Sequence, residues 1–221
     1  MRKLVFSKKR AILIGIKKKA VLCTIFLVLL LFISTSCMNV RKAETISDTS
    51  VSKEQFAHRT VAVLPVKEQS ALTTDSLLSL RVAINDKLDD KVKQELPNSK
   101  IIDTKTSVNI LNDKGKLGIM DDLIKIYDST GVFDKKLIAS LGDMLKSDYI
   151  IFSRLKAEKM AVGIIGKGFG ASLEVVIIAK AKNEIAWAGS GEFKRGGIFG
   201  FGTTENKKAA EELIHLVFSK F

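Results

Sequence analysis

This sequence has few imidazoles and thiols, the side chains that most often serve as general bases and soft metal ligands. The imidazoles are His58 and His215, and the thiols are Cys23 and Cys37. Neither histidine has a nearby Ser or Cys nucleophile with an acid at a recognisable spacing, which favours a surface or packing role for both. One thiol beyond position 36 allows no disulfide framework, and the two histidines do not complete a Cys/His zinc cluster. The residue with a specific chemical expectation is therefore Cys37.

The segment before Cys37 has the composition of a secretory signal. Eight Lys and Arg precede position 20, positions 1–37 contain no acidic residue, and residues 20–33 are an apolar run. Signal peptides carry apolar runs of ~7 to 15 residues, whereas a membrane-spanning helix needs ~20. Because Lys and Arg hold the amino end in the cytoplasm, we expect the rest of the chain to be exported.

The net charge of +12 comes mostly from this signal. Without the eight early cations the chain has 28 Lys and Arg against 24 Asp and Glu. This balance does not indicate a nucleic-acid partner.

The sequence ISTSC at 33–37 resembles the lipobox of bacterial lipoproteins. The resemblance implies cleavage before Cys37, a diacylglycerol and an N-acyl chain on that cysteine, and no other cofactor. The common pattern has Leu where Ser34 stands, so ordinary cleavage and an uncleaved signal anchor are the alternatives. Three acyl chains anchor stably, since each buried methylene adds ~0.8 kcal/mol. In lipoprotein families an Asp just after the cysteine often marks inner-membrane retention, and here Met38 and Asn39 stand in its place. This favours the outer membrane, with the domain expected on the periplasmic side and with the inner membrane and surface exposure as alternatives.

The sequence predicts three parts. Residues 1–36 are the signal peptide, residues 37–58 a lipidated flexible tether, and residues 59–221 a single periplasmic α/β domain of ordinary size. The tether is predicted because residues 39–57 are rich in Ser, Thr, Lys and Glu, with few large apolar residues.

Apolar periodicity predicts the elements of the domain. The expected strands are 60–66, 100–103, 149–155, 173–181 and 184–193, the last two forming a hairpin. The expected helices are 75–96, 134–146 and one from Thr204, with weaker helices around 108–111 and 120–127. This order predicts an α/β (α+β) fold with a mixed sheet of about five strands flanked by helices.

Two glycine-rich stretches invite comparison with phosphate-binding loops. The stretch 166–170 has no helix after it and fails the spacing of such loops, so a flexible hairpin tip is expected. The stretch 196–204 precedes a helix but has no Lys after its last glycine. Apolar residues in and beside both stretches suggest docking on a membrane or a neighbouring subunit, the alternative being that they fold into the core: Ile164, Ile165, Phe169, Ile198, Phe199 and Phe201.

The adjacent carboxylate pairs and the single tryptophan have simple interpretations. The pairs 89–90 and 121–122 lie in predicted helices, where neighbouring side chains point ~100° apart and do not converge. Both pairs are expected on solvated faces. Trp187 is expected to fill the core.

Three stretches resemble a known group of envelope proteins: RTVAVLPV at 59–66, SLGDMLKSDYIIFSRL at 140–155 and EIAWAGSGEF at 184–193. They are similar to signatures of the curli-secretion lipoprotein CsgG, the exopolysaccharide lipoprotein PelC and the amino-terminal domain of TolB. The resemblance implies an anticodon-binding-domain-like fold in the periplasm. Between Leu155 and Leu173 the chain is too short for the membrane-crossing hairpins of the curli pore, so a pore is not implied.

Two functions follow as hypotheses. The first is a non-enzymatic, lipid-anchored envelope module that assembles with itself or with envelope proteins to support secretion or export. The second is a ligand-binding or enzymatic lipoprotein using a groove near residues 163–170 and 196–202.

Overall fold

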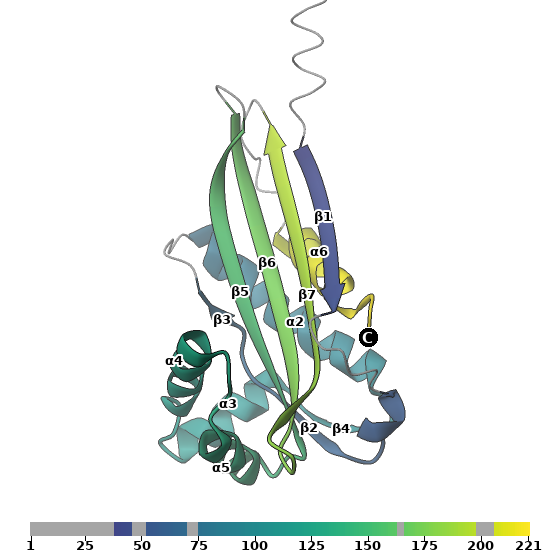
Figure 1. The fold of residues 1–221 in the computed structure, drawn as a ribbon, viewed down its shortest axis with the longest axis vertical. Coiled ribbons are helices and arrows are strands. Elements are labelled where there is room, and N and C mark those ends of the chain that lie inside the picture. The colour runs from purple at the N-terminus through teal and green to yellow at the C-terminus, as the bar shows by residue number, and fades with distance from the viewer. Residues whose placement is uncertain (1–37, 46–51, 70–74, 163–165, 198–205) are drawn as a thin grey trace, which may run out of the picture.

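The computed structural model describes residues 38–45, 52–69, 75–162, 166–197 and 206–221. It has a mixed seven-stranded sheet in the order β1-β7-β6-β5-β2-β4, with β3 beside β5 (Figure 1). The strands are β1 Met38–Thr45, β2 Thr60–Val63, β3 Lys67–Glu68, β4 Lys100–Ile102, β5 Tyr149–Val162, β6 Gly166–Ala179 and β7 Glu184–Gly197. The helices are the short 3-10 helix η1 Lys53–Phe56, α2 Asp75–Glu95, α3 Thr104–Asp113, α4 Ile119–Thr130, α5 Lys135–Leu145 and α6 Asn206–Phe218. The predicted class, a mixed sheet flanked by helices, is confirmed.

The central strand of the parallel part of the sheet is buried at Val61, Ala62 and Val63. β2 pairs with β4 on one side and with β5 on the other, both in parallel. Strands covered on both faces are continuously apolar, which is why residues 60–66 were recognisable in the sequence. The strand ends at Val63, and Leu64 and Val66 on either side of Pro65 stay buried without being strand.

The antiparallel part is longer than the sequence predicts. β5, β6 and β7 are 14 residues each and pair along nearly their whole length. The added residues, 156–162 of β5, 166–172 of β6 and 194–197 of β7, are rich in glycine and charge and so lack the apolar signal of a buried strand. Backbone pairing with the neighbouring strands does not require that signal. The predicted hairpin is confirmed, with Asn183 in the left-handed region at φ 53.

The expectation of a solvated tether before the domain is corrected by the structure. Met38–Thr45 form β1, which pairs antiparallel with β7 over all eight residues. Further on, Phe56 is fully buried, with its ring centroid 4.7 Å from that of Tyr149. The polar composition of this segment led to the wrong prediction because the edge strand β1 pairs through its backbone, which requires no apolar side chains. In the short helix η1, the buried side chain is that of Phe56.

Helices cover the two faces of the sheet unequally (Figure 1). α2 and α6 pack against each other on one face, and the predicted stripe of α2 is buried there: Leu77, Leu80, Ile84, Leu88 and Val92. α3, α4 and α5 cover the other face only around the lower halves of the long strands, where Phe152, Val176 and Ala188 join their core. None of the helices that the structure describes covers the upper halves of β5, β6 and β7 on that side.

α6 approaches the sheet closely because β7 carries glycine there. A Cβ at Gly191 would lie 2.8 Å from the Cβ of Leu216 and 2.9 Å from the carbonyl oxygen of Leu213. At Gly189 it would meet the ring of Trp187 at 2.5 Å and the carbonyl oxygen of Val217 at 3.1 Å. Two glycines spaced by two residues on one face of β7 therefore set the distance between helix and sheet.

Candidate functional site

The strands bring four chain segments together at one end of the sheet. Met38 lies opposite Gly196, which lies opposite Gly168, which lies opposite Met160. The start of β1, the end of β5, the start of β6 and the end of β7 thus meet at the top of Figure 1. We call this the strand end of the molecule. The predicted lipid-attachment residue, Cys37, lies outside the described residues but directly precedes β1.

The predicted contact residues are placed only in part. Ile164, Ile165, Ile198, Phe199 and Phe201 lie outside the described residues. Phe169 lies in β6, partly buried, with its ring centroid 6.1 Å from that of Phe193. For this residue the structure shows packing against the core, the alternative that the sequence left open.

The glycine stretches do not form loops where the structure describes them. Gly166–Gly170, predicted as a flexible hairpin tip, belong to β6 and pair with Glu158–Val162 of β5. That expectation was wrong because the connection between the two strands is shorter than assumed. Gly196 and Gly197 likewise belong to β7. A side chain at Gly170 would lie between Glu158 and Lys194, about 3.3–3.4 Å from each.

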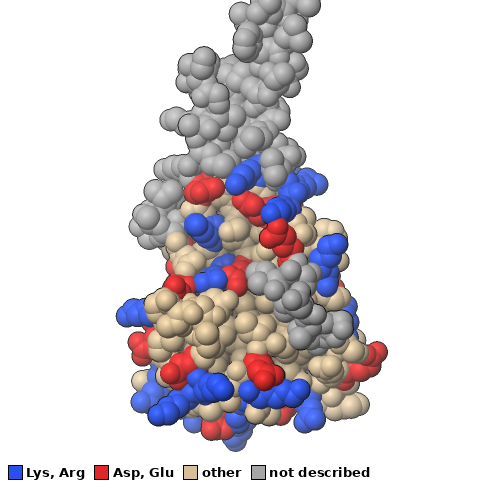
Figure 2. All heavy atoms as spheres, viewed as in Figure 1, with Lys and Arg blue, Asp and Glu red and all other residues tan. Residues whose placement is uncertain are grey.

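The uncovered sheet face is a shallow trough of balanced charge. It has a volume of ≈ 340 Å³, and charged side chains interleave with the hydroxyls of Ser172 and Ser190 along it. Figure 2 shows acidic and basic side chains intermixed over these upper strands. The charged residues that line it are Lys42, Glu44, Arg154, Lys156, Glu174 and Glu192.

Neighbouring charges in and beside the trough neutralise one another. Lys42 pairs with Glu44, and Lys194 pairs with Glu192 at 2.8 Å and reaches Glu158 at 4.0 Å. The hydrogen bonds to these carboxylates raise the pKa values of Lys42 and Lys194. Such a surface suits a polar partner better than a highly charged one.

Arg154 of β5 forms the most buried polar network of the trough. Its Nε donates to Glu174 Oε2 at 3.0 Å, its Nη2 donates to the same oxygen, and its Nη1 donates to Asp128 Oδ1 at 2.5 Å. The guanidinium lies over the ring of Tyr127, 4.5 Å from the centroid, and the Tyr127 hydroxyl donates to Glu174 Oε1 at 3.3 Å.

These contacts attach α4 to the sheet. Burial alone would lower the pKa of Arg154, but its hydrogen bonds with Glu174 and Asp128 raise it overall. Burial and the nearby Glu174 raise the pKa of Tyr127. The guanidinium is therefore permanently charged and held between two carboxylates, which is the behaviour of a structural ion pair.

The remaining candidates are dispersed over the surface or built into the core. His58 has φ 61 and its backbone N–H donates to the carbonyl of Asn98, while His215 is exposed on α6. Trp187 is buried, as predicted, against Phe218 and Phe221. Within the described ranges, His, Cys, Asp and Glu form no cluster suited to a metal ion.

The carboxylate pairs differ from the expectation in one member. Asp90, Asp121 and Asp122 are exposed, as predicted. Asp89 is half-buried and accepts hydrogen bonds from the backbone N–H and the hydroxyl of Thr104, at 3.1 and 2.9 Å, at the start of α3. The fixed position of α3 beside α2 explains the difference, and no local pattern around Asp89 signals it.

Among the helices that the structure describes, none combines the length and apolarity needed to cross a membrane.

Comparisons with known proteins relate the chain to others by fold. No protein-family description and no curated protein matches its sequence. The crystal structure of the lipoprotein GNA1162 from Neisseria meningitidis is similar, with a TM-score of 0.50 and 10% identity over 73% of this chain and 96% of that one. A PelC dodecamer from Paraburkholderia phytofirmans has a TM-score of 0.43 and 12% identity, over 83% and 96% of the two chains. The LpoB C-terminal domain from Escherichia coli has 0.36 and 9%, over 62% and 83%. The chain thus shares its fold with a bacterial lipoprotein.

Proposed function

We propose that this chain is a bacterial envelope lipoprotein, anchored through acylated Cys37, whose domain supports assembly or export without catalysing a reaction. The observation that supports it best is the position of β1. This strand begins at the residue after Cys37 and is paired with β7 from its first residue. A lipid on Cys37 would be joined to the sheet without a spacer, and the domain would be held directly at the membrane.

The described surface offers two features that suit protein partners. β1 is the last strand of the sheet, so within the described ranges its outer edge pairs with no other strand. Such edges can add a strand from another chain. The trough beside it is polar and electrically balanced, as in interfaces between soluble surfaces. The Neisseria structure with this fold is also that of a lipoprotein.

Metabolic labelling tests the anchor. In a bacterial host that processes lipoproteins, radioactive palmitate should label the wild-type chain and the Cys23→Ser variant but not Cys37→Ala. Equal labelling of wild type and Cys37→Ala, or no labelling of either, would refute acylation at Cys37.

Cross-linking in cells tests the assembly role. Photo-cross-linking residues placed at Lys42 and Glu44 of β1 should yield defined adducts with the same chain or with an envelope protein. The matched control is a cross-linker at exposed Lys182, in the turn between β6 and β7. If β1 gave no more adducts than Lys182, and the purified chain were strictly monomeric, the assembly role would be wrong.

A further inference from the structure

The strand end differs in charge from the rest of the long strands. We call residues that lie opposite one another on neighbouring strands a register row. In one row at the strand end, Arg195 of β7 lies opposite Phe169 of β6, which lies opposite Lys159 of β5. In another row, Lys167 of β6 lies between Gly197 of β7 and Ala161 of β5. These rows contain no Asp or Glu. The rows further along contain acids and bases in close pairs, including Lys194 with Glu192 and Glu158 and Arg154 with Glu174.

This cationic end is also the end at which the chain would enter the membrane. Cys37 immediately precedes Met38, and Met38 shares its register row with Gly196, Gly168 and Met160. Acyl chains on Cys37 would bring these rows to the level of the lipid headgroups. Basic residues at that level are attracted to anionic lipids within a Debye length, ~8 Å at physiological salt.

We propose that the strand end lies on an anionic lipid surface, so that β5, β6 and β7 stand upright on the membrane. The proposal rests on the proposed anchor at Cys37. Strands of 14 residues at ~3.3 Å per residue place the turn at Lys180–Asn183 about 45 Å from the headgroups. The trough then faces sideways, within reach of partners on the same membrane.

A membrane-proximity measurement on the full chain tests the orientation. In a Cys23→Ser background, a fluorophore is placed near the strand end in Glu158→Cys or in the opposite turn in Ala181→Cys, both at exposed positions. The lipoprotein is reconstituted into vesicles of phosphatidylethanolamine with phosphatidylglycerol that carry a headgroup quencher. We expect strong quenching at position 158 and almost complete loss of quenching at position 181.

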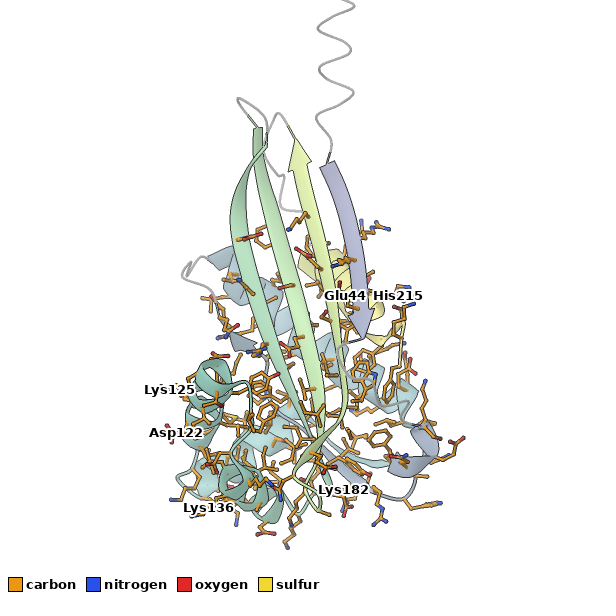
Figure 3. All side chains as sticks on the ribbon, in the orientation of Figure 1. Glu44, Asp122, Lys125, Lys136, Lys182 and His215 are labelled. Atoms are coloured by element: carbon orange, nitrogen blue, oxygen red, sulfur yellow. The ribbon has the colours of Figure 1, made fainter. Side chains whose placement is uncertain are left out.

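Charge variants test whether the cations hold the domain upright. Replacing Lys159, Lys167 and Arg195 by Gln should abolish the difference in quenching between the two labels, as should ~1 M salt, where the Debye length is ~3 Å. The matched control replaces Lys125, Lys136 and Lys182 by Gln, which removes the same charge from exposed positions remote from the strand end (Figure 3). The control should keep the difference. Vesicles of phosphatidylcholine alone should reduce it in the wild type.

The possible outcomes distinguish a failure of the proposed orientation on the lipid surface from a failure of the proposed anchor at Cys37. The parent chain without an added cysteine takes up fluorophore only if Cys37 is unacylated, and such labelling, or recovery in the soluble fraction, would overturn the anchor and the orientation together. An acylated chain with equal quenching at 158 and 181 would overturn the orientation alone. Retention of the difference in the strand-end variant would show that these cations are not its cause.

Discussion

At the residue scale, the polar groups with the most altered environments serve the structure. Arg154 ties β5, β6 and α4 together through Glu174 and Asp128, and its side chain is only 17% exposed. An ion pair of this kind contributes little net stability compared with apolar packing, but removing one partner leaves uncompensated charge. Neither its burial nor its partners can be read from the sequence, because they lie 20 and 26 positions away on other elements.

The substitution Arg154→Met should destabilise the domain by about 2–3 kcal/mol, because Glu174 and Asp128 lose their shared donor and Tyr127 loses the cation over its ring. Chemical denaturation followed by the fluorescence of Trp187 would measure this. The neighbouring exposed Lys156→Met should change the free energy of unfolding by no more than about 0.5 kcal/mol. Equal effects of the two substitutions would show that the network is not formed.

Asp89 should make stability depend on pH in a defined direction. Burial raises the pKa of Asp89, although its hydrogen bonds from Thr104 oppose the shift. A raised pKa in the folded state means that the stability linked to this group is fully present below its unfolded pKa and is lost as the pH rises through the folded pKa.

Asp89→Asn keeps an oxygen for Thr104 and removes the buried charge. We expect it to be as stable as the wild type at neutral pH or more stable by less than about 1 kcal/mol, given its partial exposure. As the pH falls toward 4, the wild type should become more stable relative to Asp89→Asn. Melting temperatures measured for both proteins across this pH range would show the change. Asp89→Ala loses the hydrogen bonds from Thr104 and should be less stable than both the wild type and Asp89→Asn over the whole pH range. If the stability of Asp89→Asn relative to the wild type increased as the pH fell, the raised pKa of Asp89 would be contradicted.

At the scale of elements, the sequence predicted what apolar periodicity marks and missed what backbone pairing makes. The stripe of α2 and the run at 60–66 were recognisable because burial leaves a pattern. β1, the upper halves of β5 and β6 and the last four residues of β7 were not, because their pairing involves peptide groups that every sequence has. The sequence alone led to the proposal of an anchor at Cys37. That the strand following Cys37 begins beside three other strand ends became known only from the register.

Gly191 offers a test of how α6 is seated. Gly191→Ala should cost about 2–3 kcal/mol, since the new Cβ would overlap Leu216 and the backbone of α6. Gly142→Ala is the control, because its Cβ would meet only the flexible methylenes of Lys180 and alanine favours the helix by about 1 kcal/mol. Denaturation curves should rank the glycine-to-alanine variants in this order, and a harmless Gly191→Ala would mean that α6 lies further from β7.

At the scale of the whole molecule, the features lie along one long axis. The strand end lies at one extremity, and the helices α3 to α5 lie toward the other (Figure 1). The trough is lined by residues of β1, β5, β6 and β7 between them. A lipid on Cys37 would orient this long axis relative to the membrane, because β1 begins at the residue after the cysteine and no spacer separates the two. The trough and the edge of β1 would then be presented at a fixed height above the membrane.

The mass of the intact mature protein, isolated from the membrane fraction of its host, tests the central claim most directly. We predict a chain that begins at Cys37 and carries the added mass of a diacylglycerol and one further acyl chain. A chain that retains Met1, or that starts at another residue with an unmodified Cys37, would contradict it.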